Sequence, residues 1–161
     1  MKLFKEKLFV VVAALLSIVG IFLMFCPFVK FSASSSFIGS SSSSAFSGFA
    51  FAFGNQSVKL SVGVLFIFIL AIVSFLLACA DVFVENKMFN LAFEGLAALM
   101  LLVAGIMCFC VIPMTGSAFG VDYGDLVKAK TSLGVGAIFD GILFLVAAIA
   151  AGVQTAKALK K

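Results

Sequence analysis

The sequence predicts an all-α integral membrane protein, a transmembrane four-helix bundle that forms one domain over residues 1–161. Composition is the first reason, because the chain is 64% hydrophobic and only 11% charged, with a mean hydropathy of +1.31. A soluble domain is about 45–50% apolar and about 25% charged. The second reason is that four apolar stretches approach the roughly 20 residues needed to cross a bilayer as a helix. The third is that lysines gather at the ends of these stretches.

The predicted helices cover about residues 8–25, 60–80, 91–112 and 133–153, separated by outer loops at 26–59 and 113–132 and an inner loop at 81–90. None of these helices contains proline. Pro27 and Pro113 instead follow the first and third helices, where proline is expected to stop a helix. The first helix begins like a signal peptide, but its apolar run is longer than a usual signal core and no A-x-A cleavage pattern follows. We therefore expect it to be retained.

The lysines predict the orientation, since basic residues are retained on the cytoplasmic side of a membrane. With the amino end inside, the cytoplasmic segments hold most of the eleven basic residues. These are Lys2, Lys5, Lys7, Lys87, Lys157, Lys160 and Lys161. We predict a multi-pass protein of the plasma membrane with both termini in the cytoplasm. The all-lysine, phenylalanine-rich composition favours a bacterial source.

The first outer loop holds the serine tract Ser40–Ser44, followed by Phe49, Phe51 and Phe53. Serine offers little to pack, so the tract predicts a flexible linker. The alternating phenylalanines have the period of a β-strand. They predict a short β segment or apolar flap on the outer helix ends. A disordered loop whose phenylalanines enter the lipid interface is an equally open alternative.

The starts of the second and fourth helices resemble each other. Lys59–Val64 and Lys130–Val135 share Lys, Ser, Gly and Val at the same positions, and an Ile-Phe pair follows each at the same spacing. We favour a duplicated helix hairpin, with the two halves related by an axis along the membrane normal.

Small residues recur at helical spacing in all four helices. Close packing of small residues drives helix association in bilayers, so these stripes predict a compact bundle. They comprise Ala13, Ser17 and Gly20; Gly63, Ala71, Ser74 and Ala78; Ala97, Ala98, Ala104, Gly105 and Cys108; and Gly136, Asp140, Ala147 and Ala151.

Asp140 is the candidate functional residue. It lies about eight residues, or roughly 12 Å of helix rise, inside the outer end of the fourth helix. An acid near mid-bilayer costs at least about 2.5 kcal/mol on insertion scales, and the first repeat has Ile69 at the matching position. Ser17, at a similar depth in the first helix, is its expected partner. Two interpretations stay open: a hydrogen-bonded Asp that joins helices, which we favour, and a proton or cation site.

The remaining acids predict ordinary roles. Glu94 is expected in the first turn of the third helix, where a negative charge complements the helix amino end. Asp81, Glu85 and Lys87 predict a solvated inner turn.

Cysteines supply one further hypothesis. Cys26 and Cys110 both fall near the outer face, so an outer disulfide is one alternative. Buried free thiols are the other, and the one that we favour. Cys108 and Cys110 are two residues apart on a helix, which is not a metal-site spacing.

Catalysis is not expected. The chain has no histidine, and no nucleophile elbow, phosphate loop, HExxH motif or dinucleotide fingerprint. We predict no enzyme, no cofactor and no metal site. The lysines form no basic stripe, so nucleic acid is not an expected partner.

Our first functional hypothesis is a non-enzymatic membrane protein that acts through contacts of its first outer loop. Its partners would be the lipid bilayer and another membrane protein, an envelope component or a second copy of the chain. The alternative is a small ion- or proton-coupled carrier or channel component that uses Asp140, with dimerisation supplying the pathway.

The loop order, with a long first outer loop, a short inner loop and a shorter second outer loop, is similar to that of claudin-type four-helix proteins. The tryptophan-rich loop motif with paired cysteines that marks that family is missing, since the chain has no tryptophan. The resemblance therefore implies neither a function nor site residues.

Overall fold

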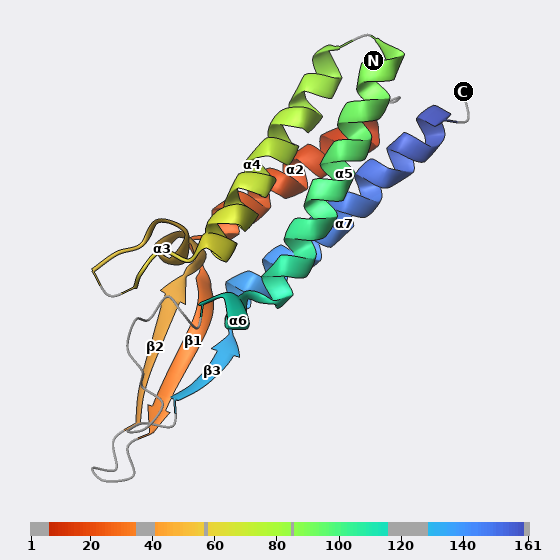
Figure 1. Cartoon of the computed structure of the whole chain (residues 1–161). Helices are drawn as coiled ribbons and strands as arrows, with labels where there is room; N and C mark the ends of the chain where they lie inside the picture. Colours follow the sequence, from red (N-terminus) through yellow and green to blue (C-terminus); the bar gives the residue numbers. More distant parts are fainter. Residues whose placement is uncertain (1–6, 35–40, 57, 85, 116–128, 160–161) are drawn as a thin grey trace.

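The computed structural model describes residues 7–34, 41–56, 58–84, 86–115 and 129–159 (Figure 1). The described chain is mostly helical. Its long helices are α2 (Leu8–Leu23), α4 (Val62–Phe83), α5 (Lys87–Phe109) and α7 (Val135–Leu159). The strands β1 (Pro27–Ser34), β2 (Ser41–Ser47) and β3 (Ala129–Leu133) extend from one end of the bundle, beside the short helices α3 (Gly48–Phe53) and α6 (Val111–Thr115). The start of α2 and the end of α7 lie at the opposite end, near the end of α4 and the start of α5.

Three of the long helices, α4, α5 and α7, are long and apolar enough to cross a membrane. The fourth, α2, is apolar but has only 16 residues. A helix of that length rises about 24 Å, less than the roughly 30 Å of a bilayer core. It ends before the predicted Phe25, because the chain turns after Met24 and enters β1 at Pro27.

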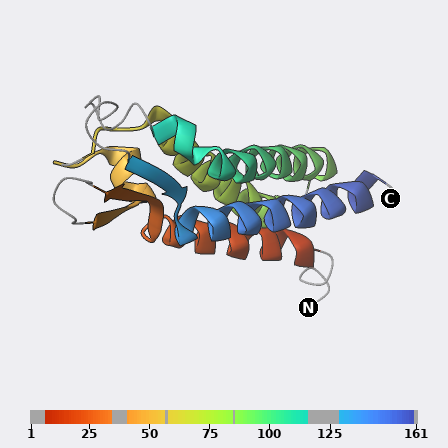
Figure 2. The same ribbon diagram turned by 90° about the horizontal axis from the view of Figure 1, so that it is seen from below.

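The four long helices form a ring in which α2 and α5 each pack against both α4 and α7 (Figure 2). The predicted stripes of small residues face inward. All of them are buried except Gly63 and Ala98, which are half-buried. Close approach is visible at Gly105, where an added Cβ would lie 2.9 Å from Cγ of Leu145. Large side chains such as Phe22 and Ile149 point away from the bundle, with about two thirds of their surface exposed.

A three-stranded antiparallel sheet of order β2–β1–β3 corrects the all-α prediction. It joins segments from both predicted outer loops, because β1 and β2 come from the first and β3 from the second. The flexible-linker prediction is wrong for Ser41–Ser44, whose backbone pairs in register with Phe31–Ser34 of β1. Backbone hydrogen bonds form such a ladder whatever the side chains are, so the serine composition did not reveal it.

The phenylalanine-rich segment forms the helix α3, so the prediction of a strand there is wrong. The Ser47 side chain caps this helix by accepting a hydrogen bond from the Ala50 amide at 3.2 Å. In a helix, Phe49 and Phe53 share a face because they are four residues apart, and their ring centroids are 4.6 Å apart. Phe51 points the other way and is fully buried. The helix packs against α4, as expected of an apolar flap on the helix ends.

Hydrogen bonds between distant segments connect the sheet and the short helices with the ends of the long helices. The Gly134 amide donates to the Phe28 carbonyl at 2.7 Å, the Phe49 amide to the Met24 carbonyl at 2.9 Å, and the Ser61 hydroxyl to the Met114 carbonyl at 2.9 Å. Phe28 and Val29 are fully buried at this junction.

Pro113 does not follow a helix as predicted but lies inside α6. It is the third residue of that helix, where the missing amide hydrogen is not needed for a helical hydrogen bond.

The two glycines that match in the proposed repeat meet similar surroundings. A Cβ on Gly134 would collide with Pro27, just after α2, and a Cβ on Gly63 would collide with Met114, just after α5. Gly134, in the second half of the proposed repeat, therefore meets the segment that follows α2, the first helix of the first half. Gly63, in the first half, meets the segment that follows α5, the first helix of the second half. The duplication itself stays a prediction.

Candidate functional site

Asp140 lies in the interior of the bundle, on the face of α7 that meets α2 and α5. Its side chain is completely buried. A Cβ added to Gly20 of α2 would lie 3.0 Å from Oδ1 of Asp140, and Cys108 of α5 interacts electrostatically with the carboxyl group. Among the described residues, neither carboxyl oxygen has a hydrogen-bond partner. Asp140 is thus a buried acid in a tight space beside Gly20, where an added Cβ would also meet the ring of Phe144.

Ser17, the expected partner of Asp140, does not bond to it in this structure. Its buried hydroxyl donates to the Ala13 carbonyl at 2.8 Å, one turn earlier in α2. Serine in a helix commonly satisfies its hydroxyl in this way. Gly20, three residues further along the same face, is the residue of α2 that meets Asp140.

All four cysteines, each in the described part of the chain, are free thiols, so the Cys26–Cys110 disulfide is not formed. Cys108 is buried and Cys110 is exposed, which agrees with the expectation that they face different ways.

A second set of polar side chains gathers at the other end of the bundle, where the chain ends lie. The ammonium of Lys7 is 3.5 Å from Oδ2 of Asp81 and also donates to the backbone carbonyls of Asp81 and Val84. Asp81 is completely buried, so the solvated-turn prediction is wrong for this residue. The reason is that α4 continues to Phe83, past the predicted end at residue 80. Lys87 is exposed as expected, and Glu85 lies outside the described residues.

Glu94 belongs to the same set. Because α5 begins at Lys87, Glu94 lies in the second turn and not in the first turn as predicted. The amino end is capped by Asn86, whose side chain accepts from the Met88 amide. Glu94 is 5% exposed. It accepts a hydrogen bond from the Gln154 side chain of α7 and interacts electrostatically with Asp81 and Lys7.

We call these residues the polar cluster. It consists of Lys7, Asp81, Glu94 and Gln154, together with Asn90, which lies one turn before Glu94 on α5. The cluster thus draws on α4, α5 and α7, and on Lys7, which directly precedes α2. All of its residues lie at one end of the bundle. Asp81 Oδ1, Glu94 Oε2 and Asn90 Oδ1 are buried without a hydrogen-bond partner among the described residues. All three are acceptor atoms, so the cluster is short of hydrogen-bond donors.

The sequence held a signal for this cluster. Asp81 continues the buried stripe of Ser74 and Ala78 at helical spacing, and Gln154 continues that of Ala147 and Ala151. A polar residue in register with a small-residue stripe is thereby placed toward the bundle interior.

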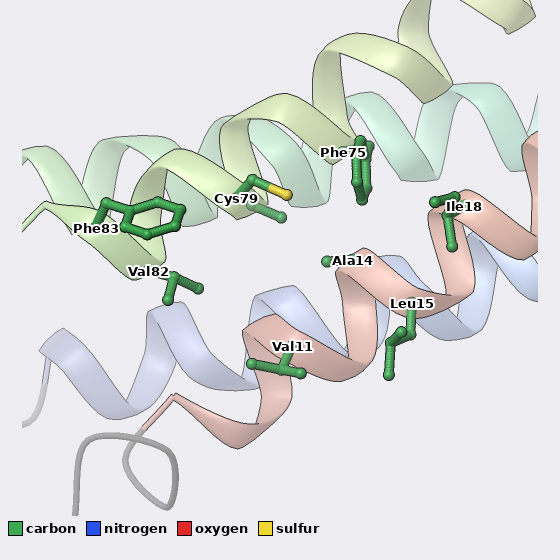
Figure 3. A pocket seen from close by; sticks show the side chains of 9 residues that line it. Val11, Ala14, Leu15, Ile18, Phe75, Cys79, Val82 and Phe83 are labelled. Carbon is green, nitrogen blue, oxygen red and sulfur yellow. The ribbon is translucent and has the colours of Figure 1, made fainter.

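A groove of about 340 Å³ opens between α2 and α4 on the flank of the bundle (Figure 3). Its lining is apolar except for the Cys79 thiol. The lining residues are Val11, Ala14, Leu15, Ile18, Phe75, Ala78, Cys79, Val82 and Phe83. Asp140 is not among them. Within the described residues, no group of three or more His, Cys, Asp or Glu side chains could hold a metal ion.

No protein-family model and no curated protein sequence matches this chain.

Proposed function

We propose that this chain is a non-enzymatic four-pass protein of the plasma membrane, with cytoplasmic termini, that acts through contacts of its outer sheet with another membrane protein or an envelope component. The observation that carries the proposal is the sheet itself. Two segments of the sequence that lie on either side of α4 and α5 combine in one structure outside the bundle.

The junction with the bundle supports a binding role. The Gly134 amide, just before α7, donates to the Phe28 carbonyl in β1, and the Phe49 amide of α3 donates to the Met24 carbonyl at the end of α2. The sheet thus continues directly into α7, and the helix that follows β2 is bonded to α2. A surface that is already ordered loses less conformational entropy when it binds. The side chains of Lys30, Thr131 and Ser132 are exposed on it, so a partner would meet hydroxyl groups and a positive charge.

The surface of the bundle supports four passes. Exposed apolar side chains occur on α2 as on the longer helices, for example Leu15 and Phe22, which are 59% and 67% exposed. Contiguous apolar surface of this kind is costly in water and is covered by lipid in a membrane. A helix as short as α2 is accommodated in a membrane by local thinning of the bilayer.

The alternative is an ion- or proton-coupled carrier or channel component in which Asp140 is the coupling group. Its support is that the buried carboxyl oxygens lack hydrogen-bond partners among the described residues. The groove between α2 and α4 does not reach Asp140, which favours the contact hypothesis.

Photo-crosslinking in intact cells tests the contact hypothesis. A photoreactive amino acid at Thr131 is expected to capture one defined protein or envelope polymer. The same residue at Ile149, which is exposed on the bundle flank, serves as the matched control and is expected to capture lipid. Identical products from both positions, or lipid alone from Thr131, would contradict the proposal.

A further inference from the structure

The polar cluster holds more negative charge than positive charge. Lys7 faces two carboxyl groups, those of Asp81 and Glu94, and the exposed fractions of the three side chains are 15%, 0% and 5%. A buried carboxylate without a compensating partner is strongly unfavourable. The Asp81 carboxylate acts electrostatically on Glu94, so the two charges repel each other as well. Taking up one proton is the usual way in which such pairs relieve the repulsion.

Lys7 cannot satisfy both acids. An ammonium group has three hydrogen-bond donors. In the described structure Lys7 donates to the backbone carbonyls of Asp81 and Val84 and lies 3.5 Å from Oδ2 of Asp81 as an ion pair. Oε2 of Glu94 receives no hydrogen bond from Lys7, and the two groups interact through their charges.

The other neighbours leave Asp81 and one carboxyl oxygen of Glu94 without a hydrogen-bond donor among the described residues. From α7, Gln154 donates to Glu94, and Lys157 lies 3.9 Å from the centre of the Phe9 ring. From α5, Lys87 is exposed at the start of the helix. Oδ1 of Asp81 and Oε2 of Glu94 are thus buried acceptors with no hydrogen-bond partner in the described chain.

We propose that Asp81 and Glu94 hold one proton between them, so that the cluster is a proton-binding site at the end of the bundle where the chain ends lie. One proton supplies the missing donor and makes the set of Lys7, one carboxylate and one carboxylic acid electrically neutral. The site is separate from Asp140 and does not depend on the outer sheet, so it stands whether or not the contact hypothesis holds.

Binding of this proton would link pH on the cytoplasmic side to helix packing. Its release leaves an uncompensated negative charge among α2, α4, α5 and α7. The helix ends would then separate or admit water. Tight packing at this end is therefore a property of the protonated cluster.

Infrared spectroscopy of the purified full-length chain in detergent tests the proposal, because a protonated carboxyl group has a C=O stretching band that a carboxylate lacks. The measurements use Asp140→Asn as the background, so that Asp140 cannot contribute to the band. At neutral pH we expect the band in this background. We expect its complete loss on adding either Glu94→Gln or Asp81→Asn, because a lone remaining acid would ionise beside Lys7.

The requirement for both acids separates proton sharing from simple burial of Glu94. If the band survives Asp81→Asn, or is absent from the background, the proposal is overturned. A sodium ion in the cluster in place of the proton would also leave the band absent. Should a variant fail to fold, isotopic labelling of the aspartate or glutamate carboxyl carbons in the folded Asp140→Asn chain replaces it. We then expect the band to respond to both labels, and a response to the glutamate label alone would overturn the proposal in favour of simple burial of Glu94. A band that moves with neither label would overturn the proposal.

Discussion

Lys7 and Asp81 form an ion pair across the bundle, with 3.5 Å between Nζ and Oδ2, although they lie 74 positions apart in the sequence. The pair ties the start of α2 to the last turn of α4. The same ammonium also caps the carboxyl end of α4, since it donates to the Val84 carbonyl at 3.3 Å.

Lys7→Met should lower the free energy of unfolding by about 1.5–3 kcal/mol, the usual contribution of hydrogen bonds to a charged group. The loss arises because Asp81 stays buried without its partner. The double variant Lys7→Met with Asp81→Asn should recover part of it, as removing both charges avoids a lone buried ion. Denaturant titration in detergent measures both. Equal stability of Lys7→Met and the unchanged chain would show that the pair contributes nothing.

Gly134→Ala should damage the junction of sheet and bundle. The new Cβ would lie 2.1 Å from the Pro27 carbonyl oxygen, and backbone there cannot move without breaking the β1–β3 ladder. A loss of about 3 kcal/mol is expected, at the upper end for overpacking. Gly152→Ala in α7 is the matched control, since nothing lies within 4 Å of its Cβ. It should stabilise the helix by about 0.5–1 kcal/mol. Similar thermal unfolding of the two variants would refute the packing at Gly134.

Phe51→Ala should destabilise the outer region by about 3–5 kcal/mol, the range for a buried phenylalanine. Phe53→Ala, two residues away, removes a side chain that is 49% exposed. It should cost less than about 1.5 kcal/mol, chiefly through ring contacts with Phe49 and Phe68. Protease protection of the region between α2 and α4 measures both. Equal protection would mean that α3 is not docked on α4.

Asp140→Asn separates the two functions. If Asp140 only joins helices, the amide keeps the shape and a hydrogen-bonding group, and the variant should behave like the unchanged chain. Since neither carboxyl oxygen has a hydrogen-bond partner among the described residues, Asp140→Leu should then weaken the bundle by no more than roughly 1 kcal/mol, the scale of interhelical hydrogen bonds. If Asp140 couples transport, Asp140→Asn should fold normally and lose all pH- or ion-dependent flux in liposomes. Full flux in Asp140→Asn would remove the carrier hypothesis.

Thiol labelling with impermeant reagents checks the orientation. Each test chain keeps one native cysteine. Cys110 is exposed near the sheet and should react only from outside the cell. Cys79 lines the groove near the other end and should react only from the cytoplasm, if at all. Labelling of Cys110 from the cytoplasm alone would reverse the proposed topology.

Hydrophobicity and small-residue spacing were enough to predict the positions of four helices and the faces by which they pack. They act locally along the chain, so a single sequence displays them. Helix ends were less accurate, because the apolar signal fades where polar residues continue a helix. Asp81 and Glu94 were misplaced for that reason, although both lie in register with buried stripes.

The sheet could not be predicted in the same way. Pairing of β1 with β3 depends on segments that the bundle brings together, and the serines of β2 carry no alternating pattern. At Phe49 and Phe53, alternating phenylalanines fitted a strand and a helix equally, and docking against α4 decided the outcome.

The β1–β3 ladder also sets an order of events during synthesis. Val29 pairs with Leu133, so β1 is made about a hundred residues before its partner. At the usual elongation rates of roughly 5–20 residues per second, that strand waits some 5 to 20 s with one edge open. Contacts of such long sequence separation form slowly. The ladder is therefore completed only after α4 and α5 have been made. A ribosome that stalls before β3 leaves β1 with an unpaired edge, which quality-control proteases can recognise.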